Sequence, residues 1–341
     1  MPLNTQLGVK AESTYGTAAV PVDTFFEFES ESITPMVETI APQVMRTTSR
    51  TVRYDRFVRG INGHTGSVSL PVMTKEFGFW LEHLVGGSVT TPGSPTDSTY
   101  THTADIGSLC GKGFTLQVNR PRGICGDTNQ AFTYAGGKVM DWTISCETGG
   151  VVMLEANCFF QSMLMTTALA SASYASGMEF LPWGASSITV GGLSLPVSNW
   201  SVACNNGMQE RPRIANSYAY GEPVEGMREI TFEATCDVEA YVDGTPSGKV
   251  GFLQKILTTG GVAATVADSY EAVVITSNGP TLAGSTTYPS LVITMSACRI
   301  DEAFGNIDGP DMTEITVRGT AMVPSSGSTC QLAYTTTDAT P

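Results

Sequence analysis

The sequence contains little charge, and only a minority of that charge is positive. Of its 341 residues, 15% are charged, with 18 Lys and Arg against 32 Asp and Glu, so the net charge at pH 7 is −14. Proteins that clamp nucleic acids use Lys and Arg to neutralise phosphates, and this balance argues against that class. The sequence has only three histidines, His64, His83 and His102, and none has a companion at metal-ligand or catalytic-triad spacing.

Long apolar runs are also absent. A membrane-spanning helix needs about 20 consecutive apolar residues. The longest apolar stretch, residues 151–165, is interrupted by Glu155, Asn157 and Gln161. The first residues show no apolar segment followed by a small-residue cleavage site. We therefore expect a soluble protein made in the cytoplasm.

The sequence carries none of the common catalytic signatures. No nucleophile elbow, zinc-protease helix, P-loop or dinucleotide-binding glycine motif is found in it. The eight cysteines form no C-x-x-C pair, and several stand beside Val, Ile or Ala at predicted strand positions, as buried reduced thiols do. We predict no catalytic residue, no metal site and no cofactor, and hence a protein that is not an enzyme.

Glycine and proline, at 36 and 18 residues, together with abundant Ser and Thr, favour many short strands joined by turns. Two stretches have helical spacing instead, and the chain is organised around them. Residues 74–86 form the first, with Thr74 as N-cap and Gly86 as left-handed stop; residues 247–259 form the second, with Ser247 as N-cap. The apolar stripes are Phe77, Trp80, Leu81, Leu84 and Val85 in the first, and Val250, Leu253, Ile256 and Leu257 in the second.

The two halves of the chain have the same order of predicted elements: strand, long hairpin, strand, helix, Gly-Gly stop and further strands. Ser67–Leu70 corresponds to Glu229–Phe232, and Lys138–Asp141 to Arg299–Glu302, each about 160 residues apart. We predict a mainly β protein with two tandem β-sandwich or open-barrel domains, each with one flanking α-helix. The predicted division is an N-terminal arm (1–24), a first β domain (25–165) with a hairpin at 43–63, a linker (166–177) and a second β domain (178–341).

Acidic residues alternate with apolar ones along two predicted strands. In residues 25–31, Phe26 and Phe28 face one side while Glu27 and Glu29 face the other. In the strand near 228–241, Glu233, Asp237 and Glu239 form the polar face. These faces are either ordinary solvated surfaces or the wall of a channel whose negative charge keeps DNA from adhering.

Five of the basic residues cluster in the predicted hairpin. They are Arg46, Arg50, Arg53, Arg56 and Arg59, with Tyr54 among them. The cluster could bind nucleic acid or remain a solvated loop. On an acidic chain, its guanidinium groups are better suited to the acidic surface of a neighbouring copy, and we predict an inter-subunit or inter-ring contact.

Several motifs together resemble the tail tube protein (major tail protein) family of long-tailed bacteriophages of the siphophage type. The stretch Leu7–Thr17 resembles the usual opening of that family, and Phe132–Val139 resembles its Tyr-x-Gly-x-Lys-Val turn before a central strand. The acidic strand at 25–31, the long hairpin and the strand-helix-Gly-Gly unit follow in the family order. The resemblance extends over the whole chain as a pattern.

The resemblance implies a β-sandwich or open barrel flanked by a helix, whose inner sheets join into rings that stack into a virion tail tube assembled in the host cytoplasm. DNA would pass through without specific binding during ejection, and a tape measure protein and tail terminator and tip proteins would be partners. The inferred duplication favours three chains in a pseudo-six-fold ring over six chains with the extra domain outside. A β-rich decoration or adhesion protein of a phage or cell surface is the rival interpretation.

Overall fold

The computed structural model describes residues 5–42, 51, 55–91, 99–121, 129–213, 218–237, 270–282, 287–304 and 314–341. Within them the protein is mainly β, as predicted, with one α-helix, α1 (Gly78–Val85), and one short 3-10 turn, η1 (Trp183–Ala185). The strands are β1 Leu7–Ala11, β2 Thr24–Phe26, β3 Ser30–Glu31, β4 Thr34–Ile40, β5 Val58–Pro71, β6 Tyr100–Asp105, β7 Phe114–Asn119, β8 Ala131–Glu147, β9 Met153–Phe160, β10 Ser162–Leu164, β11 Ser186–Val190, β12 Leu193–Leu195, β13 Val197–Asn205, β14 Gln209–Pro212, β15 Tyr220–Val224, β16 Glu229–Asp237, β17 Tyr270–Asn278, β18 Ser290–Phe304, β19 Glu314–Ala321 and β20 Gln331–Thr336.

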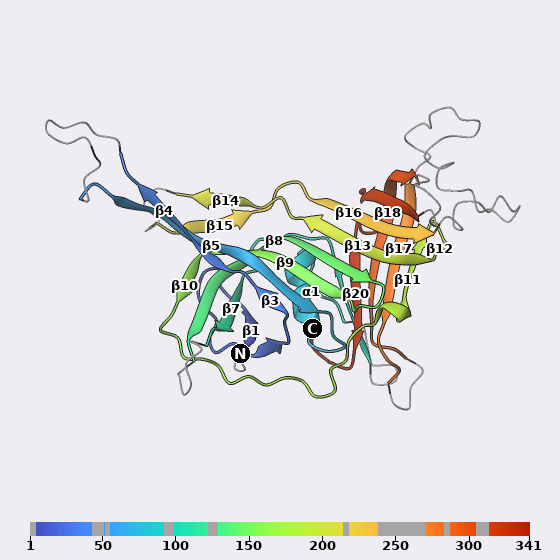
Figure 1. Ribbon diagram of the computed structural model, residues 1–341, viewed down its shortest axis with the longest axis horizontal. Helices are drawn as coiled ribbons and strands as arrows, with labels where there is room; N and C mark the ends of the chain where they lie inside the picture. Colours follow the sequence, from blue (N-terminus) through green and yellow to red (C-terminus); the bar gives the residue numbers. More distant parts are fainter. Residues whose placement is uncertain are drawn as a thin grey trace, which may run out of the picture.

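One antiparallel sheet runs through the whole molecule, and we call it the long sheet. Its strand order is β4·β5·β9·β8·β13·β16·β19·β18. The join between its halves is β13, which pairs with β8 from Asn205 opposite Asp141 to Asn199 opposite Glu147. In Figure 1 the long sheet crosses the upper part of the molecule, from β4 and β5 on the left to β16 and β18 on the right.

A second layer packs under each half of the long sheet. In the first half, β7 pairs with β8 and with β1, β1 pairs with β2, and β10 pairs with β8. In the second half, β17 pairs with β18 and with β11, β11 pairs with β12, and β20 pairs with β18. The long strands β8 and β18 belong to both layers, and β20 also pairs with β6, which links the halves a second time.

The helix α1 lies inside this β framework, where Trp80, Leu81, Leu84 and Val85 are fully buried. It ends as predicted at Gly86, whose φ of 82° is the left-handed cap conformation.

The start of the helix differs from the prediction, which placed it at residue 74 with Thr74 as N-cap. The Thr74 hydroxyl instead accepts a hydrogen bond from the Glu179 amide, and its carbonyl accepts one from the Thr336 hydroxyl. These distant contacts compete for the residues of the expected first turn, and the helix begins at Gly78. The predicted helix at 247–259 lies outside the described residues.

Two predicted N-terminal features also differ. Residues 7–11 do not form a projecting arm, because β1 lies between β2 and β7 and buries Leu7 and Val9 completely. The strand expected at 25–31 is divided into β2 and β3, and Phe25 and Phe26 are both buried, which breaks the alternation. Apolar burial on both sides of the chain overrides the pattern here.

The stretch predicted as linker, 166–177, contains no helix or strand. It crosses the second layer of the first half, along the bottom of Figure 1 and away from the long sheet. Side-chain hydrogen bonds hold this stretch against the second layer. The Gln117 side chain accepts from the Ala170 amide and donates to the Ala168 carbonyl, and the Gln6 side chain donates to the Ala170 carbonyl.

Candidate functional site

One face of the long sheet is polar from β5 to β19. Directly opposed residues of paired strands share a face, and one such row runs Ser69, Glu155, Thr143, Ala203, Thr231 and Thr320. The opposite face carries the buried side chains, among them Trp142, Val202 and Phe232. The exposed or half-buried members of the polar face are Thr65, Ser67, Ser69, Asp141, Thr143, Ser145, Glu147, Glu155, Asn157, Asn199, Ser201, Ala203, Asn205, Glu229, Thr231, Glu233, Thr235, Glu314, Thr316, Arg318 and Thr320.

The charge on this face is predominantly negative. Arg318 is balanced by two carboxylates, with its Nε 2.9 Å from Glu233 and its Nη1 3.3 Å from Glu302. Hydrogen bonding to Glu233 raises the pKa of Arg318, so it stays a cation at any ordinary pH. Asp141, Glu147, Glu155, Glu229 and Glu314 also lie on the face, so carboxylates outnumber the guanidinium among its members.

A hairpin formed by β4 and the first part of β5 projects from the body of the molecule (Figure 1). Its described side chains include the exposed cations Arg56 and Arg59. It also exposes four large apolar side chains, which are Val37 at 59%, Ile40 at 48%, Phe57 at 54% and Val58 at 52%. Apolar groups gathered on a projecting element are typical of a surface that binds a partner.

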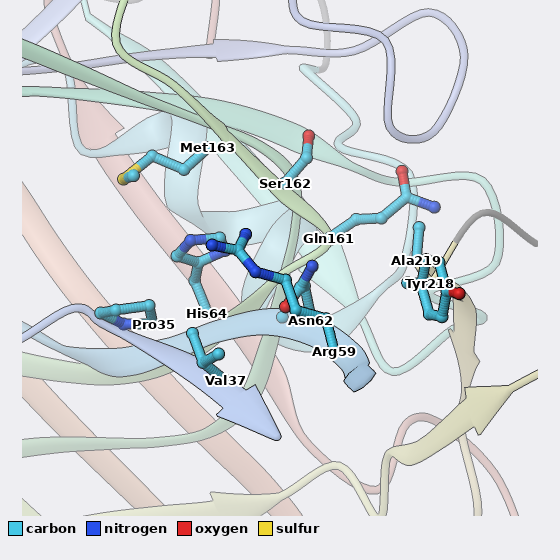
Figure 2. Close-up of a pocket in the computed structure, with 11 residues that line it drawn as sticks. Pro35, Val37, Arg59, Asn62, His64, Gln161, Ser162, Met163, Tyr218 and Ala219 are labelled. Carbon is cyan, nitrogen blue, oxygen red and sulfur yellow. The ribbon is translucent and has the colours of Figure 1, made fainter. Parts of the chain in front are cut away.

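A second hairpin, β14 paired with β15, lies beside the first. Asn62 of β5 bridges to Ala219 and donates its amide to the Tyr218 carbonyl at 2.8 Å. Between the two hairpins is a hollow of about 380 Å³, lined among others by His64, Arg59 and Met163 (Figure 2). Burial lowers the pKa of His64, which keeps its ring neutral in the hollow.

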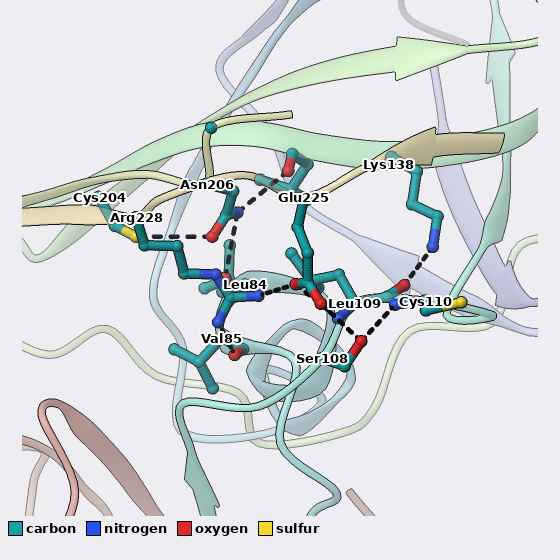
Figure 3. Close-up of polar contacts among 12 residues, drawn as sticks. Leu84, Val85, Ser108, Leu109, Cys110, Lys138, Cys204, Asn206, Glu225 and Arg228 are labelled. Atoms are coloured by element: carbon teal, nitrogen blue, oxygen red, sulfur yellow. Dashed lines mark hydrogen bonds and ion pairs between the residues drawn. The ribbon is translucent and has the colours of Figure 1, made fainter. Parts of the chain in front are cut away.

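The end of α1 is held by polar side chains from β8 and from the residues next to β13 and β16 (Figure 3). The Leu84 carbonyl accepts from Trp142 Nε1 at 3.0 Å and from Asn206 Nδ2 at 3.3 Å, and the Val85 carbonyl accepts from Arg228 at 2.7 Å. A cation and two donors thus meet the negative end of the helix dipole. Because Asn206 and Arg228 come from the second half of the chain, this contact fixes the helix of one half to the other.

Two ion pairs complete that contact. Glu225 lies 2.7 Å from Arg228, and Glu222 lies 2.8 Å from the buried Lys138, which also donates to the Leu109 carbonyl. Burial alone would raise the pKa of Glu225. Hydrogen bonds from Ser108 and Leu109 and the charge of Arg228 outweigh that effect, so the pKa of Glu225 is lowered and it remains ionised. The buried charge of Lys138 is paired, and its ion pair with Glu222 joins the two halves of the chain.

The predicted acidic candidates are dispersed. Glu233 lies on the polar face of the long sheet, and Asp237 stands at the end of the same strand, β16. Glu27 and Glu29 are exposed on the segment between β2 and β3, and the Glu29 amide donates to the Ser69 carbonyl of β5 at 2.9 Å. Glu239 lies outside the described residues.

The predicted contact residues are only partly placed. Arg56 and Arg59 are on the projecting hairpin, whereas Arg46, Arg50, Arg53 and Tyr54 lie outside the described residues. Sequence reasoning missed Asp141, Glu147 and Glu155 as members of the polar face. Alternation with Trp142, Ile144, Leu154 and Ala156 was the signal that could have found them.

The fold and its surfaces define a structural β protein suited to association with other molecules. A model of the phage tail tube protein family matches residues 2–321, and the chain belongs to this family. It is therefore a structural component of the virion tail. No curated protein matches the chain. Among the described residues no helix is long and apolar enough to cross a membrane.

Proposed function

We propose that this protein polymerises into stacked rings that form the tube of a phage tail, with the long sheet lining a bore through which DNA is ejected. The observation that carries the proposal is the continuous antiparallel sheet, polar on one face and open at β4 and at the end of β18, which lie at opposite ends of the molecule (Figure 1). Complementary borders at opposite ends associate head to tail and close into a ring if the rotation permits.

The composition of the polar face suits the wall of such a bore. Its many hydroxyl and amide groups are wetted by water, and its excess carboxylates repel DNA phosphates over about 8 Å at physiological salt. A wall rich in Lys and Arg would retain the DNA instead. Glu233 is the predicted lumen residue that this arrangement supports most directly, with Asp237 at the end of the same strand and Glu27, Glu29 and Glu239 as further candidates.

The topology of the halves supports a ring of three chains. The order β4·β5·β9·β8 in the first half recurs as β13·β16·β19·β18 in the second. The lower layers recur too, with β10, β7, β1 and β2 matching β20, β17, β11 and β12. Two equivalent domains per chain would give pseudo-six-fold symmetry with three chains, whereas six chains would place the second domain outside the inner wall.

The projecting hairpin is proposed as the contact between rings or subunits. Its exposed apolar side chains would be buried against a neighbouring copy, and its arginines would meet that copy's carboxylates. The solvated-loop interpretation does not explain Phe57 and Val58, which are 54% and 52% exposed. The tape measure protein inside the tube and terminator and tip proteins at its ends are proposed as further partners.

Replacement of Arg50, Arg53 and Arg56 with Glu tests the hairpin. We expect a folded subunit that forms no tubes, because the contact would become repulsive. The matched control replaces the same residues with Lys, which keeps the charge and should retain tubes. Negative-stain microscopy and circular dichroism provide the readouts. Tubes of normal length from the Glu variant would refute the role of the hairpin.

Microscopy of the unmodified protein tests the function itself. Open-ended tubes with three-fold rings are expected. Particles that stay monomeric or trimeric under all assembly conditions would favour the decoration or adhesion interpretation, and strict six-fold averages would refute the three-chain ring.

A further inference from the structure

The internal join between the halves provides a template for the join between subunits. We propose that β4 of one copy pairs antiparallel with the end of β18 of the next copy, with Met36 opposite Glu302 and Thr34 opposite Phe304. This inference rests on the proposed ring and adds its strand pair and register.

The internal seam consists of β13 paired with β8. It places Asn205 opposite Asp141 and Ala203 opposite Thr143. The seam shows how the last strand of one four-strand unit, β8, receives the first strand of the next unit, β13. The corresponding strands at the two ends of the long sheet are β18 and β4.

Matching β-bulges align β8 with β18. The register between β8 and β9 shifts between Val139 and Asp141, and that between β18 and β19 shifts between Ile300 and Glu302. Bulges are specific local features, so their recurrence fixes the alignment. A second register shift also occurs in both halves. It lies next to Gly137 in the pairing of β8 with β7, and next to Cys298 in the pairing of β18 with β17. Asp141 therefore corresponds to Glu302, and the residue two further on, Thr143, corresponds to Phe304.

The same registers align β5 with β16. Asn157 lies opposite both Asp141 and Ser67, and Arg318 lies opposite both Glu302 and Glu233. Since Asp141 corresponds to Glu302, Ser67 corresponds to Glu233. This alignment is four residues away from the one expected from sequence, which matched Ser67 with Glu229.

The first strands of the two units follow from that alignment. Ser32 donates its amide to Ser67 at 2.9 Å, and Ser201 lies opposite Glu233, so Ser32 corresponds to Ser201. Counting four residues along each strand, Met36 corresponds to Asn205. Because Asn205 lies opposite Asp141 in the internal seam, Met36 falls opposite Glu302 in the seam between copies.

The projecting hairpins provide an independent check of the alignment. Ile40 lies opposite Val58 in the first hairpin, and Gln209 lies opposite Val224 in the second. In sequence, Ile40 follows Met36 by the same number of positions as Gln209 follows Asn205. Likewise, Val58 precedes Ser67 by the same number of positions as Val224 precedes Glu233. The alignment derived from the bulges thus predicts both pairs.

Both proposed borders are open in the described part of the chain. β4 pairs only with β5, and beyond Arg299 β18 pairs only with β19. Next to β4, the Ile33 amide donates to Glu31 at 3.1 Å and the Ile33 carbonyl accepts from Arg120 at 2.9 Å. Occupied groups of this kind protect an edge strand from indiscriminate pairing and confine the seam to the stretch from Thr34 onward.

Cysteine cross-linking tests the register. The variant Met36→Cys/Glu302→Cys is assembled into tubes, with Cys110 and Cys125 replaced by Ser, and is then oxidised with diamide. Opposed residues of paired strands lie within the Cα separation that a disulfide spans. We expect dimers and trimers on denaturing gels, with trimers as the largest closed species. A mixture of the two single variants should stop at dimers, because each chain then carries one reactive site.

Two controls define the outcome. Ala203→Cys/Thr143→Cys lies in the internal seam and should form a disulfide within one chain. This control shows that diamide oxidation cross-links opposed residues of two paired strands. Met36→Cys/Arg299→Cys is out of register and should cross-link at least tenfold less. Tubes whose in-register pair cross-links no better than the out-of-register pair would overturn this inference and leave the proposed function standing. Failure of the unmodified protein to form any tubes would instead overturn the proposed function.

Discussion

At the residue scale, the fold depends on a few buried polar side chains. His83 is one of them: it lies on α1 with its ring centroid 4.6 Å from that of Phe79 and 5.1 Å from that of Phe114. Burial first, and then the nearby charge of Lys138, lowers the pKa of His83 to about 3. The folded protein therefore keeps this imidazole neutral in mildly acidic solution.

This shift predicts acid sensitivity. Below the ordinary histidine pKa of 6.5, His83 is protonated in the unfolded chain but stays neutral in the folded chain. The free energy of unfolding therefore falls as the pH is lowered from 6.5 towards 3. Between pH 7 and pH 5 the loss from this group is at most about 2 kcal/mol. His83→Phe keeps an aromatic ring and should reduce the difference in urea-unfolding free energy between these pH values by up to that amount.

Phe79→Leu is the matched control, because it disturbs the same packing without removing a titrating group. It should lower stability at both pH values by a similar amount. An unchanged pH difference in His83→Phe would show that other groups cause the acid sensitivity.

At the element scale, β3 and β4 reach the border of the long sheet by close contact with β5. A Cβ added at Gly66 would lie 2.5 Å from Ile33 Cα and 2.6 Å from Ile33 N. Both are backbone atoms, so the edge segment itself would have to move. Glycine at this position is what lets the border lie against β5.

Gly66→Ala should therefore destabilise the subunit by about 1–3 kcal/mol and reduce the yield of tubes collected by sedimentation. Gly184→Ala is the matched control, since no atom lies within 4 Å of its added Cβ. Thermal unfolding measures the first effect. Normal stability and normal tube yield in Gly66→Ala would contradict the assigned role of this contact.

At the scale of the whole molecule, the polar face of the long sheet and the linker lie on opposite sides. In the proposed ring, the polar face would point into the bore and the linker would lie on the outside. Cysteine accessibility distinguishes the two locations, because a bulky polyethylene glycol maleimide is excluded from a narrow bore.

Glu155→Cys should react quickly in the free subunit and at least tenfold more slowly in intact tubes. Ser173→Cys, on the exposed linker, should react at a similar rate in both states. Mass-shift gels report both reactions. Equal rates for Glu155→Cys in the subunit and the tube would place this face outside the bore.

Part of this architecture could be predicted from local sequence and part could not. The spacing of Trp80, Leu81 and Leu84 predicted α1, and Gly86 predicted its end. The start of α1 was wrong because Thr74 is engaged by Glu179 and Thr336, which are distant in sequence. Such contacts leave no periodic signal around Thr74 itself.

The sharing of β8 between β9 and β13 could not be predicted for the same reason. Alternation in Trp142, Ile144 and Cys146 indicates a strand with one buried face, but it does not say which strands flank it. The burial of Lys138 depends likewise on Glu222, a residue of the other half. The alternation of apolar residues indicates which face of a strand is buried, whereas the neighbouring strands and their register are set by the tertiary fold.

The covalent link between the halves has a kinetic consequence. Because β8 and β13 belong to one chain, the seam between them closes during folding, at a rate independent of protein concentration. The chain that connects them, residues 148–196, keeps the two strands at a high effective concentration. A ring of three such chains would need fewer bimolecular encounters to close than a ring of six separate domains, so dilution would slow only the seams that remain between molecules.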